Sequence, residues 1–170
     1  MPRTYEPIAS QTLGSDAASV TFSSIGGSFT DLLLVCALKT TRSSGTSESM
    51  YLRLNGDTGS NYSATALRGE GTAASSYRES SATYIYLGEG PLTSRSGDAV
   101  FQVSVMSYAN TSVYSTVLSS FAEPASYVGR HVGLWRNTAA VTSVSFMPST
   151  GGVNLKSGST FSLFGIKASA

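Results

Sequence analysis

The sequence predicts an all-β protein, a two-sheet antiparallel sandwich of about nine or ten strands with a jelly-roll-like arrangement. Short stretches of alternating apolar and polar residues recur at intervals of roughly 8–14 residues, between turns rich in Gly, Asn and Ser. No stretch keeps the helical period for long. A hydrophobic content of 41% is sufficient for a core, and no linker or repeat divides the chain. We therefore expect one domain over residues 1–170.

The first segment, residues 4–13, contains Pro7, which lacks an amide donor and so suits an edge strand or an extended arm. Pro2 and Pro7 would also reduce the entropy lost when such an arm becomes ordered. Two interpretations remain open. Residues 1–8 are either an N-terminal arm that binds a neighbouring subunit, with Tyr5 among its contacts, or the start of the protein's own first strand.

Residues 31–40 (DLLLVCALKT) contain the longest unbroken apolar run of the chain. Glycine and serine on both sides leave no room for a long helix, and a membrane span would need about 20 apolar residues. We expect a central strand that is buried on both faces, with a structural, unreactive Cys36. Its two faces carry Leu32, Leu34, Cys36 and Leu38 on one side, and Leu33, Val35 and Ala37 on the other.

The other expected strands follow from the same alternation. They cover residues 19–25, 50–54, 82–87, 99–108, 113–121, 126–137, 141–147 and 159–167. Residues 61–67 (NYSATAL) suggest one or two helical turns, and residues 69–81 suggest a polar, mobile loop. The Asn-Gly and Thr-Gly pairs in residues 55–61 (NGDTGSN) predict a tight turn. A calcium site is the competing interpretation, but Asp57 is the only carboxylate there.

The most unusual strand is expected in residues 126–137 (SYVGRHVGLWRN). One face would carry Tyr127, His131 and Trp135, separated by glycines that allow close approach of another group. These rings either fill the core or a subunit contact, or form a platform for a flat sugar ring. Arg130 and Arg136 would lie on the opposite face among aliphatic residues, which indicates partial exposure or an interface.

We expect no enzymatic activity, no metal and no cofactor. One cysteine, one histidine and ten dispersed carboxylates provide no catalytic or transition-metal motif. Eleven Lys and Arg against ten acids make no basic patch for nucleic acid. The first ten residues contain no apolar stretch typical of a signal peptide, so we expect synthesis in a cytoplasm. A net charge of +1 leaves little repulsion to oppose self-association.

Several stretches resemble a family of small β-sandwich virion proteins of tailed bacteriophages, especially those of cyanobacteria and marine bacteria. They are YEPIAS at residues 5–10, VTFSSI at 20–25, TDLLLV at 30–35, LRLNGD at 52–57 with NYS at 61–63, and the closing FGIK within residues 158–167. The resemblance implies a jelly-roll-like fold, trimeric assembly and a place on the virion.

From this resemblance we expect a capsid decoration (cement) protein on the capsid surface, which binds the major capsid protein and bridges neighbouring subunits. The alternative is a receptor-binding domain of a tail fibre or spike that contacts a host surface glycan. The candidate contacts for either role are Tyr5, Tyr127, Arg130, His131, Trp135 and Arg136.

Overall fold

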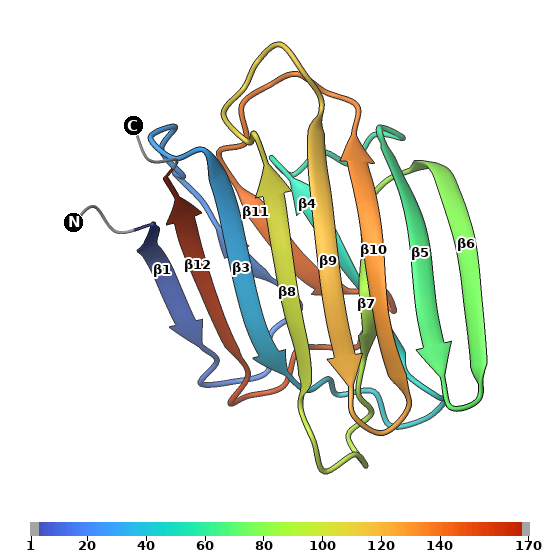
Figure 1. Ribbon diagram of the computed structural model, residues 1–170. Helices are drawn as coiled ribbons and strands as arrows, with labels where there is room; N and C mark the ends of the chain where they lie inside the picture. Colours follow the sequence, from blue (N-terminus) through green and yellow to red (C-terminus); the bar gives the residue numbers. More distant parts are fainter. Residues whose placement is uncertain (1–3, 168–170) are drawn as a thin grey trace.

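The computed structural model describes residues 4–167 and contains two antiparallel sheets packed face to face, which confirms the predicted all-β sandwich (Figure 1). The larger sheet has eight strands in the order β1-β12-β3-β8-β9-β10-β5-β6, and the smaller has four in the order β2-β11-β4-β7. The larger sheet comprises β1 (Tyr5–Thr12), β12 (Thr160–Ile166), β3 (Asp31–Leu38), β8 (Ala99–Met106), β9 (Ser115–Glu123), β10 (Tyr127–Trp135), β5 (Tyr62–Glu70) and β6 (Ala73–Ala82). The smaller sheet comprises β2 (Val20–Phe22), β11 (Val144–Pro148), β4 (Glu48–Leu54) and β7 (Ile85–Gly90). Within residues 4–167, no helix is long and apolar enough to cross a membrane.

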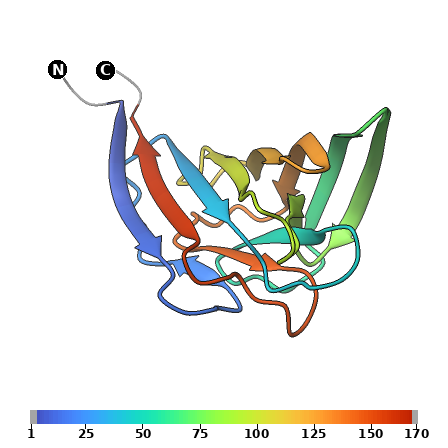
Figure 2. The same cartoon turned by 90° about the horizontal axis from the view of Figure 1, so that it is seen from below.

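The larger sheet is strongly curved. Seen from below, β1 and β12 at one end and β5 and β6 at the other rise away from the smaller sheet (Figure 2). The smaller sheet packs against the convex side, and the core lies between the two sheets. The side chains of β3, β8, β9 and β10 alternate between this core and the concave side, as a period of two requires.

The run at residues 31–40 forms β3, a central strand between β12 and β8, as predicted. Leu32, Leu34, Cys36 and Leu38 face the core and are all buried. On the concave side the expectation of burial is correct for Leu33, which is 8% exposed, and wrong for Val35, which is 37% exposed. The reason is that no element among residues 4–167 covers the concave side of the larger sheet. The apolar run therefore supplies one buried face and part of an open apolar surface.

Two segments differ from their sequence-based expectations. Residues 62–70, expected to begin with helical turns, form strand β5, and residues 73–82, expected to be a mobile loop, form β6. β5 and β6 pair along their whole length as a hairpin at the edge of the larger sheet. These two strands account for the difference between the expected nine or ten strands and the observed twelve. Almost every residue of β6 is exposed, so it lacks the apolar alternation that identifies a half-buried strand.

The pairing of the N-terminal segment supports the interpretation that these residues begin the protein's own first strand. Tyr5, Glu6 and Pro7 pair with Ile166, Gly165 and Phe164 of β12, so residues 5–8 belong to the edge strand β1 and are not a free arm. Pro7 sits beside a bulge between Pro7 and Ala9, which is where an edge strand tolerates a residue without an amide donor. Residues 1–3 of the proposed arm lie outside the described residues.

We predict that Cys36 reacts slowly with thiol reagents under native conditions. Its side chain is 1% exposed, and burial raises the pKa of its thiol far above the usual value, so little thiolate is present. Cys36→Ser should lower the free energy of unfolding by about 1–3 kcal/mol, the cost of a poorly satisfied buried hydroxyl. The checks are the labelling rate and urea unfolding. Labelling as fast as in the unfolded protein would contradict the placement of β3.

Candidate functional site

The concave side of the larger sheet is the candidate binding surface, because two hollows lie on it. The strand registers arrange its central side chains in rows that cross five strands. The middle row, which we call the polar row, runs across β5, β10, β9, β8 and β3 as Leu67, Arg130, Ser120, Gln102 and Val35. Adjacent strands are about 4.8 Å apart, so its three polar side chains are regularly spaced across the sheet.

The rows on either side of the polar row are mainly apolar. On one side the same strands place Gly69, Val128, Ala122, Val100 and Ala37. On the other side they place Thr65, Val132, Leu118, Ser104 and Leu33. Val128 is 61% exposed and Leu67 59%, values that are unusual for such side chains at the centre of a sheet. We call these three rows together the concave face.

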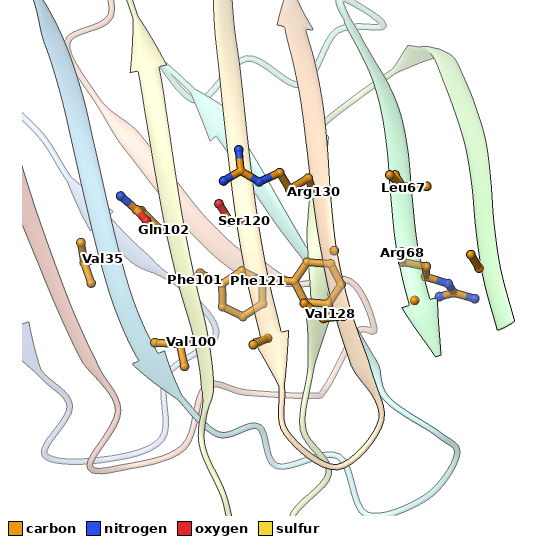
Figure 3. A pocket seen from close by; sticks show the side chains of 14 residues that line it. Val35, Leu67, Arg68, Val100, Phe101, Gln102, Ser120, Phe121, Val128 and Arg130 are labelled. Atoms are coloured by element: carbon orange, nitrogen blue, oxygen red, sulfur yellow. The ribbon is translucent and has the colours of Figure 1, made fainter. Parts of the chain in front are cut away.

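Two hollows lie on the concave face, with volumes of about 850 and about 440 Å³. The larger is centred on the Val128 row and the smaller on the Val132 row, and both are bounded by Leu67, Arg130, Ser120 and Gln102. The polar row therefore separates two adjoining hollows. The larger is lined mainly by apolar residues, and the smaller combines the apolar Leu67, Leu118 and Val132 with serine and threonine side chains. Figure 3 shows the Arg130 side chain extending from β10 across β9 towards Ser120 and Gln102, with Val100 and Val128 in the larger hollow.

Arg130 differs from the arginines that the fold uses internally. The guanidinium of Arg42 contacts Glu48 at 2.8 Å, and that of Arg68 contacts Glu89 at 3.1 Å. Arg130 is exposed and has no hydrogen bond or ion pair with any residue from 4 to 167. None of the described residues that line the two hollows is Asp or Glu. The concave face thus carries an uncompensated positive charge between apolar surfaces.

The structure does not bring the six predicted site residues together. Tyr127, His131 and Trp135 point into the core and are 5%, 3% and 1% exposed, which agrees with the core interpretation of this strand face. In this arrangement they present no ring to a sugar. Arg130 is the only one of the six whose side chain lies on the concave face between the hollows; His131 also lines the smaller hollow, but its side chain is buried. Burial also holds the pKa of His131 below its usual value.

The two remaining predicted residues lie apart from the hollows. Tyr5 is exposed on the edge strand β1, at the far end of the larger sheet from the β5–β6 hairpin. Arg136 follows β10, and its Nη2 donates to the carbonyl oxygens of Ser60 and Tyr62 at 2.9 and 3.3 Å. That pair of bonds gives Arg136 a structural role in holding the loop before β5.

A buried polar cluster lies on the core side of β10, near the edge strand β7. Glu89 accepts hydrogen bonds from Tyr86 and from Arg68 at one carboxylate oxygen, and from Ser47 at the other. Nδ1 of His131 lies 3.3 Å from the carbonyl oxygen of Tyr86, while its Nε2 has no partner among the described residues. Both carboxylate oxygens of Glu89 therefore have hydrogen-bond partners within the protein. Glu89 lies in β7 of the smaller sheet and Arg68 in β5 of the larger sheet, so the cluster connects the two sheets.

The turn at residues 55–61 is confirmed. Asn55 and Gly56 both have positive φ, at 53° and 64°. Asp57 is occupied by internal donors: its Oδ2 accepts from Nε1 of Trp135 at 2.7 Å and from Asn61 at 2.9 Å, and its Oδ1 accepts from the amide of Gly59 at 2.8 Å. These bonds hold the pKa of Asp57 below its usual value. Among residues 4–167 no three His, Cys, Asp or Glu side chains gather to hold a metal ion.

We predict that a chelator leaves the melting temperature unchanged, because protein donors already satisfy the Asp57 carboxylate. Asp57→Ala should lower the free energy of unfolding by about 1–3 kcal/mol, since it leaves the buried Nε1–H of Trp135 without its acceptor. The control is Asp98→Ala. The exposed carboxylate of Asp98 lies 3.6 Å from Nζ of Lys39, so its removal should change the free energy of unfolding by less than about 1 kcal/mol. A melting temperature that falls by many degrees on chelation would reinstate the calcium interpretation.

Comparison with known proteins returned no matching family model and no matching curated protein.

Sequence reasoning identified Arg130 but missed the other members of the polar row. Ser120 and Gln102 are ordinary outward residues of alternating strands, and nothing in their local sequence distinguishes them. One available signal was the apolar character of alternate outward positions, such as Val100 and Leu118. Outward strand positions that face water are usually polar, so apolar residues there indicate a surface that another molecule covers.

Proposed function

We propose that this protein is a binding module that attaches to a larger protein assembly through its concave face, as a capsid decoration protein of a tailed bacteriophage. The observation that carries the binding role is the pair of adjoining hollows, open to solvent and left uncovered by the described chain. Exposed apolar surface of this kind is typical of protein interaction sites. The choice of a phage capsid as the assembly rests on the sequence resemblance.

A decoration protein stabilises a shell because it binds only the assembled form, so every bound copy shifts the equilibrium towards assembly. Trimeric assembly, which the resemblance implies, would present several concave faces to the shell at once. Linked contacts raise the effective concentration of each face near its site, so weak individual contacts give durable attachment. Light scattering of the purified protein tests the trimer.

The second candidate, a glycan-binding domain of a tail fibre or spike, has less support. Sugar rings are commonly held by exposed aromatic rings. Phe101 and Phe121 line the larger hollow but are 1% and 3% exposed, and the aromatic face of β10 is buried. The accessible side chains of the larger hollow are mainly aliphatic, among them Val35, Val100 and Val128, which favours a protein surface over a sugar.

The test is the amount of this chain in purified particles of the virus that encodes it, measured by quantitative mass spectrometry. A shell presents many equivalent sites, so decoration predicts on the order of hundreds of copies per particle, and a fibre tip predicts tens or fewer. Absence from the particles would overturn the virion assignment.

Attachment through the concave face is tested separately with particles stripped of this chain. Val128→Lys should abolish rebinding, because it places a charge in the larger hollow. Val113→Lys is the matched control, since Val113 is also an exposed valine, at 48%, and lies outside both hollows. Equal rebinding of the two variants would show that the concave face is not the attachment surface.

A further inference from the structure

The concave face has the chemistry to select its occupant by charge. We propose that it binds an acidic, aliphatic segment of a partner protein, in which a carboxylate pairs with Arg130 and apolar side chains on both sides of it fill the two hollows. This inference rests on the proposed function, because it names the chemistry of the partner at that same face.

The first step is the charge at the centre of the face. Arg130 is exposed, has no partner among the described residues, and lies where no Asp or Glu lines either hollow. Arg78, which is opposite Thr65 in the β5–β6 register, adds a second cation at the edge of the same face. An arginine buried beneath an apolar partner without an anion would incur a large desolvation cost. The occupant must therefore bring the anion.

The second step is the geometry around the guanidinium. An arginine binds a carboxylate through two parallel N–H donors. Ser120 and Gln102, on the next two strands of the polar row, supply a hydroxyl and an amide beside this site. Such neutral groups can hydrogen-bond the backbone or polar groups that flank the carboxylate without competing for its charge. The polar row thus accommodates one acidic residue within a peptide.

The third step is the distribution of apolar surface. The hollows lie on both sides of the polar row, so the anion binds in the middle of the occupant and not at its end. A fatty acid carries its carboxylate at one end of a single chain and would leave one hollow empty. A protein segment with aliphatic residues before and after an acidic residue fills both.

The inference is tested first on the isolated protein. The probe is a capped seven-residue peptide with a central glutamate flanked by valines and serines, compared with the same peptide carrying glutamine. Binding is followed by NMR shifts of the Val35 and Val128 amides. We expect the glutamate peptide to bind roughly tenfold or more tightly than its glutamine twin. Arg130→Gln should remove that preference, and Arg130→Lys should keep part of it, because lysine retains the charge without the two-donor geometry.

Three outcomes would overturn the inference. They are equal binding of the two peptides, a preference that survives Arg130→Gln, and shifts confined to residues outside the concave face. If the protein instead self-associates and Arg130→Gln makes it monomeric in sedimentation, the occupant is a second copy of this chain and the partner segment is wrong. Because Arg130 is exposed and makes no hydrogen bond or ion pair with the described residues, its variants should fold, which circular dichroism verifies.

Rebinding to stripped particles separates this inference from the proposed function. If Val128→Lys abolishes rebinding and Arg130→Gln leaves it unchanged, attachment uses the concave face without a carboxylate, so only the further inference fails. If neither variant affects rebinding while the peptides still show the charge preference, the face binds acidic segments but is not the capsid attachment surface.

Discussion

Gly88→Ala is expected to lower the free energy of unfolding by about 3 kcal/mol or more, from backbone strain of about 1–3 kcal/mol and overpacking of about 1–3 kcal/mol. Gly88 lies in β7 at a φ of 135°, a backbone angle that residues with a Cβ atom rarely adopt. An added Cβ would lie 2.3 Å from Cδ1 and 2.4 Å from Cγ of Phe121. Those atoms are near the fixed base of the ring, so a rotation of Phe121 gives little relief.

Neighbouring rings also restrict Phe121. Its ring centroid is 5.8 Å from that of Phe101 and 5.2 Å from that of His131, both buried. The measurement is urea unfolding followed by circular dichroism. Gly151→Ala is the matched control, because a Cβ there would meet nothing within 4 Å, and its effect should stay within about 0.5 kcal/mol. Equal stability of the two variants would show that β7 does not pack closely on β9.

Trp135→Ala is expected to lower the free energy of unfolding by about 3–5 kcal/mol, the range for truncating a large buried aromatic side chain. Trp135 is 1% exposed and stacks on Tyr62, with ring centroids 6.4 Å apart and planes at 17°. The substitution also removes the Nε1–H group of Trp135, which donates a hydrogen bond to Oδ2 of Asp57 at 2.7 Å. It therefore loosens both the end of β10 and the turn at residues 55–61.

Trp135→Phe separates the two contributions. It keeps a ring against Tyr62 but removes the donor, so we expect a loss of about 1–3 kcal/mol. Tyr114→Ala is the control. Tyr114 is 49% exposed, so removing its ring should change the free energy of unfolding by less than about 0.5 kcal/mol. Trp135 is the only tryptophan, so unfolding is followed by circular dichroism and not by its fluorescence. A loss from Trp135→Ala no greater than that control would contradict the core placement of the β10 aromatic face.

The concave face shows how one sequence pattern can serve two surfaces. In β3, leucines at alternate positions build the core, while Leu33 and Val35 between them belong to the opposite face. A strand buried on both faces and a strand with one buried and one uncovered apolar face have the same local sequence. The difference is whether another layer covers the second face, and here the described chain provides none.

The sequence by itself determined the features that depend on neighbouring residues. Alternation placed Leu34 and Cys36 together on one face of β3 and separated the aromatic face of β10 from Arg130. Pro7 indicated an edge strand or an extended arm, and Asn55-Gly56 indicated a turn with positive φ. Each follows from local geometry, because successive side chains of a strand point to opposite faces and few residues accept a left-handed backbone.

Only the tertiary structure decided which strands pair. β12 inserts between β1 and β3, although the 121 residues from 39 to 159 lie between the end of β3 at Leu38 and Thr160. β6 becomes a strand because β5 supplies its hydrogen bonds, since its Ala- and Ser-rich sequence has little apolar surface of its own. The polar row likewise combines Gln102, Ser120 and Arg130 from three strands through their registers. Register and strand order are set by pairing between residues far apart in the sequence. The local sequence of a strand therefore does not show which other strand will pair with it.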